Sequence, residues 1–162
     1  MPDFLTDCLN LIDAEFDGRS WNGPSLMATL EKLGAEEAAS QKTWEGYSAW
    51  ELAIHCAQCK HLLASDLGAQ LEPFPFKGPG YFNQPTETGE EAWKRDLAYF
   101  RRCHKDLMAT LRALPPARLD EVMPTWKHPY REVIAWLCTH DSFHGAQIRS
   151  MGLPSLKEKK ES

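Results

Sequence analysis

The chain has 162 residues, of which 43% are hydrophobic and 25% are charged, and its formal net charge is -5. This length suits one domain with a hydrophobic core, so we expect residues 1–162 to form a single domain. A negative net charge offers no electrostatic basis for binding nucleic acid, and no apolar run approaches the roughly 20 residues that span a bilayer. The cysteines are five, an odd number, and the N-terminus lacks a signal-peptide pattern, so we expect free thiols and a cytoplasmic protein.

The first forty residues show helical periodicity. One apolar face is formed by Leu5, Leu9, Ile12 and Phe16. Spacings of three and four residues predict a helix that ends near Gly18. A shorter helical segment is predicted next, with Pro24 in its first turn. Its apolar face is formed by Leu26, Leu30 and Leu33.

The next helix has a clear start signal. Ser48-Ala49-Trp50-Glu51 matches the capping box, in which the Ser and Glu side chains each accept a free backbone N–H at a helix start. We therefore predict a helix from Ala49 to Leu67, with Gly68 just beyond its end.

The following helix is predicted from a second capping-box match, Thr88-Gly89-Glu90-Glu91, to the Pro115-Pro116 pair. Its seam alternates by four and three residues, as in helical bundles. The seam comprises Trp93, Leu97, Phe100, His104, Leu107, Leu111 and Leu114. The last helix is predicted from Pro129, in its first turn, to about Met151, and residues 157–162 are expected to form a frayed tail.

Residues 70–87 lack the periodicity of a helix or a strand. The segment holds Pro73, Pro75, Pro79 and Pro85 together with Phe74, Phe76, Tyr81 and Phe82. A connection of this length is uncommon in a compact domain and calls for a structural reason.

Two histidines interrupt the apolar seam of the last helix. The seam comprises Val133, Leu137, His140, His144, Ile148 and Met151. His140 and His144 are four residues apart, so their side chains project from one face on adjacent turns and can converge on one ion. The alternative is a pair of hydrogen-bonded core histidines. Burying two neutral imidazoles requires partners for four ring nitrogens, which favours the metal site.

A third ligand must come from another helix, and His55 is the best candidate. It lies about 10 Å from the start of its helix, and His144 lies about 12 Å from the end of the last helix, so their levels match if the two helices are antiparallel. His104 lies about 21 Å into its own helix, a turn or more from this level, and is not expected to be a ligand. His61 and His128 are expected at the surface.

Cys56-Ala57-Gln58-Cys59 is a CxxC motif beside His55, and such a motif can indicate a zinc or redox site. It lies in mid-helix, without a second CxxC and outside any βαβ pattern. We therefore expect two small core residues, with Cys59 on the same face as His55 and able to line the site.

The sequence resembles the DinB-like family of helical metalloproteins, which includes a YfiT-like branch, in three stretches. These are Trp21-Asn22-Gly23-Pro24-Ser25-Leu26, Gly46-Tyr47-Ser48-Ala49-Trp50-Glu51-Leu52-Ala53-Ile54-His55 and His140-Asp141-Ser142-Phe143-His144-Gly145-Ala146-Gln147-Ile148. The resemblance covers most of the chain in helix order. Its specific part is one His followed by an HxxxH motif with Gln three residues on. Many members have H-x-G-Q after the second His, whereas here the glycine is displaced to Gly145.

The resemblance implies an all-α four-helix bundle with up-down-down-up topology, a three-His site for nickel or zinc, and a homodimer. That topology makes the helix of His55 antiparallel to the helix of His140. Consecutive helices that run the same way need a long connection, so residues 70–87 are expected to be the crossover between the second and third bundle helices, with its aromatics facing the bundle. The alternative, an active-site lid, is not preferred because the segment begins far from His55.

Three His ligands leave at least one coordination position open, which is typical of catalytic zinc. Members of the family that the sequence resembles include metal-dependent thiol transferases, isomerases that use a low-molecular-weight thiol, and hydrolases. We therefore expect a metal-dependent transferase that activates the thiol of a small cosubstrate and acts on a small molecule. The alternatives are a metal-dependent hydrolase and a non-catalytic metal-binding stress-response module.

Five further residues are candidates for the pocket around the ion. Tyr47 and Asp141 are candidates for moving a proton, although Asp141 is more simply a supporting or solvent-facing carboxylate. Trp21, Trp44 and Cys59 are candidates for binding substrate. Trp21, Trp44 and Tyr47 are equally well interpreted as core aromatics.

Overall fold

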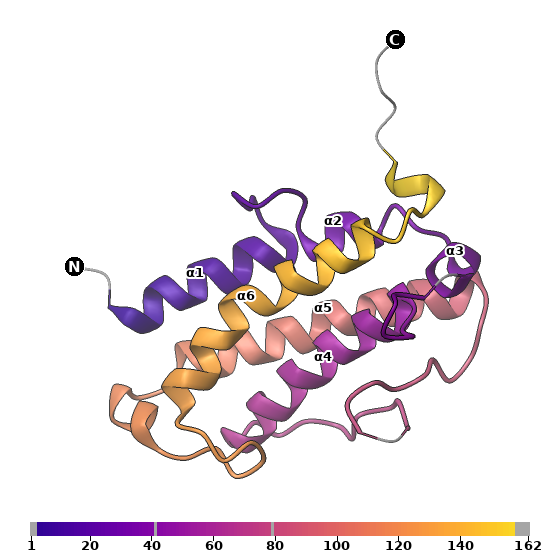
Figure 1. Cartoon of the computed structure of the whole chain (residues 1–162). Helices are drawn as coiled ribbons and strands as arrows, with labels where there is room; N and C mark the ends of the chain where they lie inside the picture. The colour runs from indigo at the N-terminus through magenta and orange to yellow at the C-terminus, as the bar shows by residue number, and fades with distance from the viewer. Residues whose placement is uncertain (1–2, 41, 79, 158–162) are drawn as a thin grey trace.

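The computed structural model describes residues 3–40, 42–78 and 80–157. Within these ranges the chain is helical, with only two isolated β-bridges, so the expected all-α fold is confirmed (Figure 1). The α-helices are α1 (Phe4–Asp17), α2 (Leu26–Leu30), α3 (Ala35–Ser40), α4 (Ala49–Asp66), α5 (Glu90–Arg112) and α6 (Tyr130–Arg149). Two short 3₁₀ helices, η1 (Pro116–Asp120) and η2 (Pro154–Leu156), follow α5 and α6. None of the described helices combines the length and apolar content needed to cross a bilayer.

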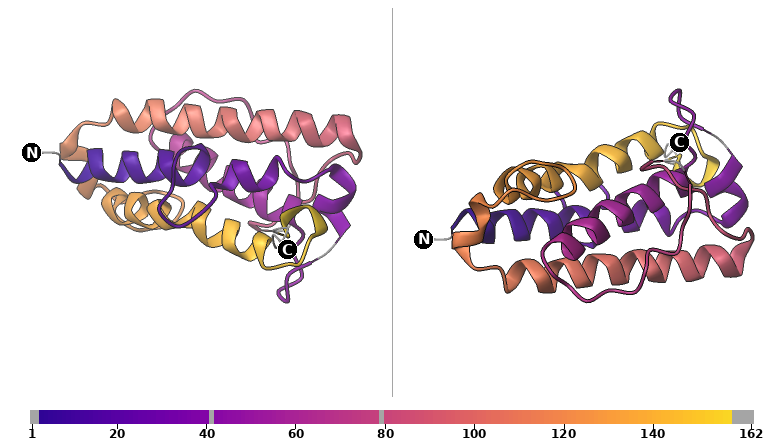
Figure 2. Two further views of the ribbon diagram at one scale, coloured as in Figure 1. Left: turned by 90° about the horizontal axis from the view of Figure 1, so that it is seen from above. Right: turned by 90° about the horizontal axis from the view of Figure 1, so that it is seen from below.

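The four long helices, α1, α4, α5 and α6, lie side by side along one axis (Figures 1 and 2). Helices α4 and α5 both run away from the end of the molecule that carries α3, whereas α1 and α6 run towards it (Figure 1). The helix that carries His55 is therefore antiparallel to the helix that carries His140 and His144.

Side-chain caps mark the starts of three of the described helices, α1, α2 and α4. Ser48 and Glu51 form the predicted capping box: the Ser48 hydroxyl accepts the Glu51 N–H at 3.2 Å, and the Glu51 carboxylate accepts the Ser48 N–H at 2.6 Å. The second predicted capping box is wrong. Helix α5 starts after Gly89 without a side-chain cap, and the Glu90 carboxylate instead accepts the backbone N–H of Ala35 at 2.7 Å, which ties the start of α3 to α5.

The segment after α1 differs in detail from the prediction. Ser25, not Pro24, stands at the start of α2, where its hydroxyl accepts the Ala28 N–H at 3.2 Å. The helical segment is also divided in two, with Leu33 in the turn between α2 and α3. Pro129 likewise precedes the first turn of α6 instead of lying within it.

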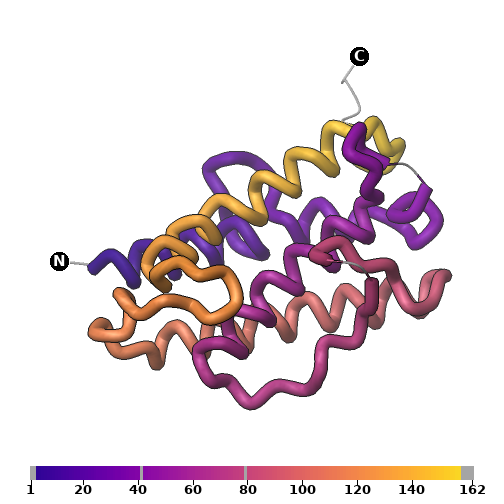
Figure 3. Tube along the Cα trace, turned by 60° about the horizontal axis from the view of Figure 1, so that its bottom comes forward, coloured from indigo at the N-terminus to yellow at the C-terminus, as the bar shows by residue number. Residues whose placement is uncertain are grey.

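Residues 67–89 connect α4 to α5 along the outside of the bundle (Figure 3). Their aromatic side chains face the bundle as expected: Phe76 is buried in the core, and Phe74 and Phe82 pack against it. Tyr81 is the exception and is partly exposed. Pro79 and residues 158–162 of the expected tail lie outside the described residues.

The core consists of two apolar clusters separated by buried polar side chains. One cluster surrounds Trp50 and Trp93 near the α3 end, and the other surrounds Leu107 and Tyr130 at the opposite end. The polar residues in the middle of the four long helices are His55, Lys60, His104, Asp141 and His144. Charged or imidazole groups are rarely buried in mid-bundle unless they are paired or serve a site.

A buried ion pair joins the two helices that carry the three candidate histidines. Lys60 of α4 lies 2.5 Å from Asp141 of α6 between Nζ and Oδ2, and both side chains are almost fully buried. The Lys60 ammonium also lies 3.8 Å from the centre of the Phe16 ring. Because Asp141 follows His140 directly, this contact fixes how α6 stands against α4 beside the histidines.

We predict that Lys60→Met destabilises the fold by roughly 3–5 kcal/mol, because it leaves a buried carboxylate without its partner. The double variant Lys60→Met/Asp141→Leu should recover most of that loss, since no unpaired charge remains. Denaturant unfolding of the two single variants and the double variant measures this coupling.

The exposed pair Arg131–Asp120 supplies the control. Arg131→Met should change the unfolding free energy little, because exposed ion pairs contribute little. A double variant no more stable than Lys60→Met would contradict the interpretation.

Candidate metal centre

Three histidine rings meet in the middle of the bundle. His55 lies in the second turn of α4, and His140 and His144 lie on successive turns of α6. The Nε2 atom of His140 is 3.1 Å from Nε2 of His55 and 3.2 Å from Nε2 of His144. The structure thus brings together the three side chains that the sequence singles out.

The tautomer of His55 is set by the crossover segment. Its Nδ1 lies 2.8 Å from the carbonyl oxygen of Tyr81. A carbonyl oxygen only accepts, so Nδ1 carries the hydrogen and Nε2 keeps its lone pair. Phe82 stacks on the same ring with centroids 4.3 Å apart. Residues 70–87 begin far from His55, as expected, but the segment returns to the ring at Tyr81 and Phe82, so the distance of its start is no argument against contact with the site.

The tautomer of His144 is set by Gln147. The His144 Nδ1 atom lies 2.6 Å from Oε1 of Gln147, and Nε2 of Gln147 donates to the Glu45 carboxylate at 3.2 Å. Because the carboxylate requires the amide nitrogen, the amide oxygen must face His144, and Nδ1 of His144 must carry the hydrogen. The Nε2 lone pair of His144 then points at His140.

These contacts leave the three Nε2 atoms short of hydrogens. His140 has one hydrogen to offer on Nε2, yet two lone pairs face that atom, and its buried Nδ1 has no partner among the described residues. A divalent cation resolves the conflict, since it accepts all three lone pairs. Two nitrogens at 2.0–2.1 Å from a tetrahedral ion lie about 3.3–3.4 Å apart. The residues present therefore fit a metal ion.

Burial keeps the rings neutral. Desolvation lowers the pKa of His55 to about 4. Desolvation, with the neighbouring His144, His55 and Lys60, lowers the pKa of His140 to about 3. The pKa of His144 is also lowered, mainly by burial. Neutral imidazole is the form that binds metals, so the site is ready for an ion at neutral pH.

Tyr47 and Asp141, the two candidates for moving a proton, have direct partners other than the three histidines. Tyr47 stacks on Phe82, with centroids 3.8 Å apart, and reaches His55 only through that ring. Asp141 is 1% exposed and paired with Lys60, so the interpretation of a solvent-facing carboxylate is wrong. One Asp141 oxygen, Cys56 and a ring nitrogen of His140 lie within 4.8 Å of one another, so Asp141 lies beside His140, but no hydrogen bond joins the two side chains.

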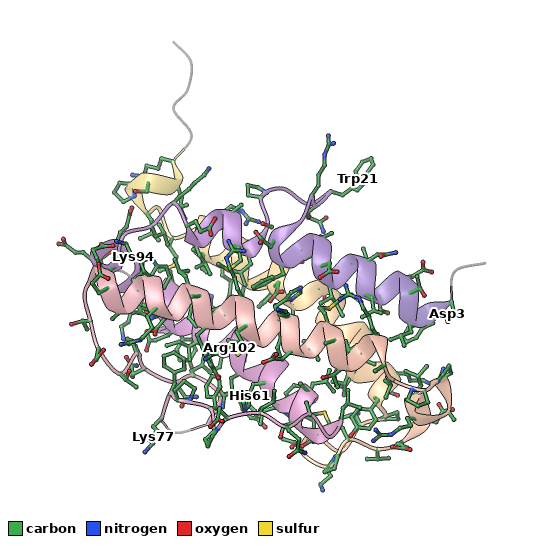
Figure 4. All side chains as sticks on the ribbon, turned by 180° about the vertical axis from the view of Figure 1, so that it is seen from behind. Asp3, Trp21, His61, Lys77, Lys94 and Arg102 are labelled. Carbon is green, nitrogen blue, oxygen red and sulfur yellow. The ribbon has the colours of Figure 1, made fainter. Side chains whose placement is uncertain are left out.

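Trp21 and Trp44 are not core aromatics. Trp21 is 102% exposed in the connection between α1 and α2 and projects away from the helices (Figure 4). It takes no part in the histidine cluster. Trp44 is 93% exposed and, with Glu45, Phe143 and Gln147, lines an open hollow of about 610 Å³. Since Gln147 and Glu45 hold His144, this hollow lies beside the site.

Cys59 lies next to the histidines. Its Sγ atom is 4.0 Å from Nε2 of His55, and burial raises its thiol pKa to about 12. Cys56 is also buried, and all five cysteines, each of which lies in the described part of the chain, are free thiols. The CxxC residues are thus core side chains, with Cys59 also at the edge of the site.

His104 stands apart from the cluster, as expected. Its Nε2 lies 2.7 Å from Asp13 of α1, and its ring stacks on Phe16. His128 is exposed, as expected, whereas His61 is half-buried beside Phe74. Lys60, Tyr81 and Phe82 were not anticipated as neighbours of the site. The only sign in the sequence that Lys60 has a special role is its charge, since it lies in a helix made mostly of apolar and small residues.

We predict that the metal-free protein loses stability as the pH falls from about 6.5 to about 4. In that range the unfolded chain takes up protons on histidines whose pKa is about 6.5, whereas buried His55, His104 and His140 stay neutral. Protons therefore favour the unfolded state, and stability is retained above pH 6.5.

Urea unfolding with a chelator present, at pH 7 and pH 4.5, measures this effect. His104→Gln should reduce the fall by roughly 2 kcal/mol, because it removes one titrating group outside the cluster. Identical pH dependence in the variant and the wild type would refute the assignment.

Comparison with known proteins places the sequence in a family. The family described as the DinB superfamily matches residues 21–148, a span that includes all three clustered histidines. Comparisons with curated proteins and with solved structures found no match. The family match covers well over half of the chain, which therefore belongs to the DinB superfamily.

Proposed function

We propose that His55, His140 and His144 hold one divalent ion, nickel or zinc, within an up-down-down-up four-helix bundle, and that the protein is a metal-dependent transferase. The observation that carries this proposal is the convergence of three Nε2 atoms. Two of them, in His55 and His144, carry no hydrogen, because the hydrogen of each ring is on Nδ1. A core of ordinary hydrogen-bonded histidines would pair each ring nitrogen with a donor or an acceptor.

The proposed chemistry follows from the number of ligands. Three protein ligands leave a coordination position open, and the ion when bound supplies a Lewis acid that stabilises a thiolate at neutral pH. The chain's own residues orient this centre. The Tyr81 carbonyl and the Gln147 amide hold the Nδ1 hydrogens of His55 and His144, and Phe82 keeps water from one face of His55.

The acceptor is proposed to be a small molecule and the second substrate a low-molecular-weight thiol. The 610 Å³ hollow beside Glu45 and Gln147 is large enough for a small ligand and is lined by both apolar and charged groups. We further propose a homodimer, in line with the family resemblance.

Cys59 favours one alternative. Its Sγ atom lies only 4.0 Å from Nε2 of His55, so a small movement would let it complete a closed four-ligand site. Closed sites of this kind are structural, and the protein would then be a non-catalytic metal-binding stress-response module.

We predict one divalent ion per chain after loading, by elemental analysis. His144→Ala should weaken metal binding by at least an order of magnitude, because it removes one of three ligands. His104→Ala is the matched control: it removes a buried histidine outside the cluster and should retain the ion. Removal of the metal should lower the melting temperature, since the ion binds only the folded chain. Equal loading of the two variants would exclude this ligand set.

We predict that added thiols bind directly to the ion in the cobalt-substituted protein. 2-Mercaptoethanol should produce a thiolate-to-cobalt charge-transfer band in wild type and in Cys59→Ser alike. A panel of electrophiles should then show thiol-dependent turnover that His144→Ala abolishes. If the band is present before any thiol is added, disappears in Cys59→Ser and does not respond to 2-mercaptoethanol, the closed structural site replaces the transferase.

A further inference from the structure

A small cavity of about 200 Å³, here called the apolar slot, borders the histidine cluster. It is lined by Cys59, Trp126, Val133, Trp136, Leu137 and His140. These residues come from α4, from the connection before α6, and from α6 itself. The slot thus lies between the two helices that carry the histidines, and none of its lining side chains belongs to Asp, Glu, Lys or Arg.

Trp126 presents an apolar wall to the slot because its polar atom is already used. Its Nε1–H donates to the hydroxyl oxygen of Tyr81 at 3.0 Å. The carbonyl of the same Tyr81 accepts from Nδ1 of His55. One residue of the crossover therefore holds both a wall of the slot and a member of the histidine cluster.

Two lining residues connect the slot to the proposed ion. His140 belongs to the cluster itself, and Sγ of Cys59 lies 4.0 Å from Nε2 of His55. A molecule that fills the slot would therefore lie against the histidine cluster.

The other hollows near the cluster differ in chemistry. The 610 Å³ hollow includes Lys42 and Glu45. A 440 Å³ hollow that also borders Trp136 and His140 includes Asn22 and Arg149. Polar or charged parts of a substrate can be accommodated there. The apolar slot offers no partner for a charge, and a charge buried there would be strongly disfavoured.

We propose that the apolar slot binds an uncharged, ring-sized apolar group of the acceptor substrate, such as a monosubstituted benzene ring. An apolar cavity of about 150 Å³ holds benzene, so 200 Å³ suits a ring with a small substituent. Trp136 is 50% exposed at the same place, and ligand pockets are lined predominantly by hydrophobic and aromatic side chains. The inference rests on the proposed function only for the ligand's role as a substrate, not for its binding.

The test is ¹⁹F NMR titration of the full chain with 4-fluorotoluene, with and without metal. Saturable binding is expected in both states, because the slot is formed by the protein alone. In metal-free protein, 4-fluorobenzoate should bind at least tenfold more weakly than 4-fluorotoluene, since its carboxylate finds no partner in the slot. The metal-free state is used for this comparison because a carboxylate can itself bind a metal ion.

Three variants locate the binding. Trp136→Glu places a charge at the half-exposed wall and should weaken 4-fluorotoluene binding at least tenfold. Leu137→Phe fills the slot and should have a similar effect. Trp21→Glu is the matched control, since Trp21 is a fully exposed tryptophan that lines neither the slot nor the histidine cluster, and the affinity of this variant should equal that of wild type.

The result that overturns the proposal is equal affinity of 4-fluorotoluene for wild type, Trp136→Glu and Leu137→Phe, or equal affinity of wild type for the toluene and the benzoate. Metal content is measured on the same samples. A protein that takes up one ion per chain but does not bind the ring refutes the slot alone. A protein that binds the ring but takes up no ion on metal loading refutes the proposed function alone.

Discussion

Three imidazole nitrogens that direct their lone pairs at one point repel each other unless a cation lies between them. The rest of this structure is arranged to keep them there. His55 comes from one helix and His140 and His144 from another of opposite direction. Nε2 of His140 lies 3.1 Å from Nε2 of His55 across the two helices and 3.2 Å from Nε2 of His144 on its own helix. Burial adds to the effect, because it keeps the rings neutral and so keeps the lone pairs available.

The loops take part in this arrangement as much as the helices do. Metal-binding histidines almost always donate the other ring N–H to an acceptor, and for His55 and His144 each acceptor belongs to a different part of the chain. The Tyr81 carbonyl lies on the crossover between α4 and α5, and the Gln147 amide is oriented by Glu45 of the loop before α4. Two requirements therefore explain the length of the crossover. It connects two helices that run in the same direction, and it brings the Tyr81 carbonyl to His55.

Sequence patterns were sufficient for the four long helices and for His140 and His144, because both leave periodic signals. Apolar spacing located α1, α4, α5 and α6, and the HxxxH spacing located two of the histidines, whereas His55 was selected by its depth in α4. The patterns failed where a contact joins residues distant in sequence. The Glu90 carboxylate accepts the N–H of Ala35 instead of capping its own helix. The Tyr81 carbonyl accepts from His55, and Lys60 pairs with Asp141 across the bundle. No local sequence pattern encodes such contacts. The exposure of Trp21 could likewise not be predicted from the residues next to it in the sequence.

Burying polar side chains between the two apolar clusters, here called the polar belt, costs desolvation free energy that a bundle with a wholly apolar core would not lose. A buried ion pair such as Lys60–Asp141 is seldom more stable than an apolar pair of similar size, so its value must lie in position. The two partners stand one on each ligand helix, and Asp141 adjoins His140 in sequence. An apolar contact would tolerate sliding of one helix along the other, whereas a 2.5 Å ion pair accepts one register. That register is the one at which the three nitrogens meet, and in this way the cost of the polar belt is linked to the geometry of the site.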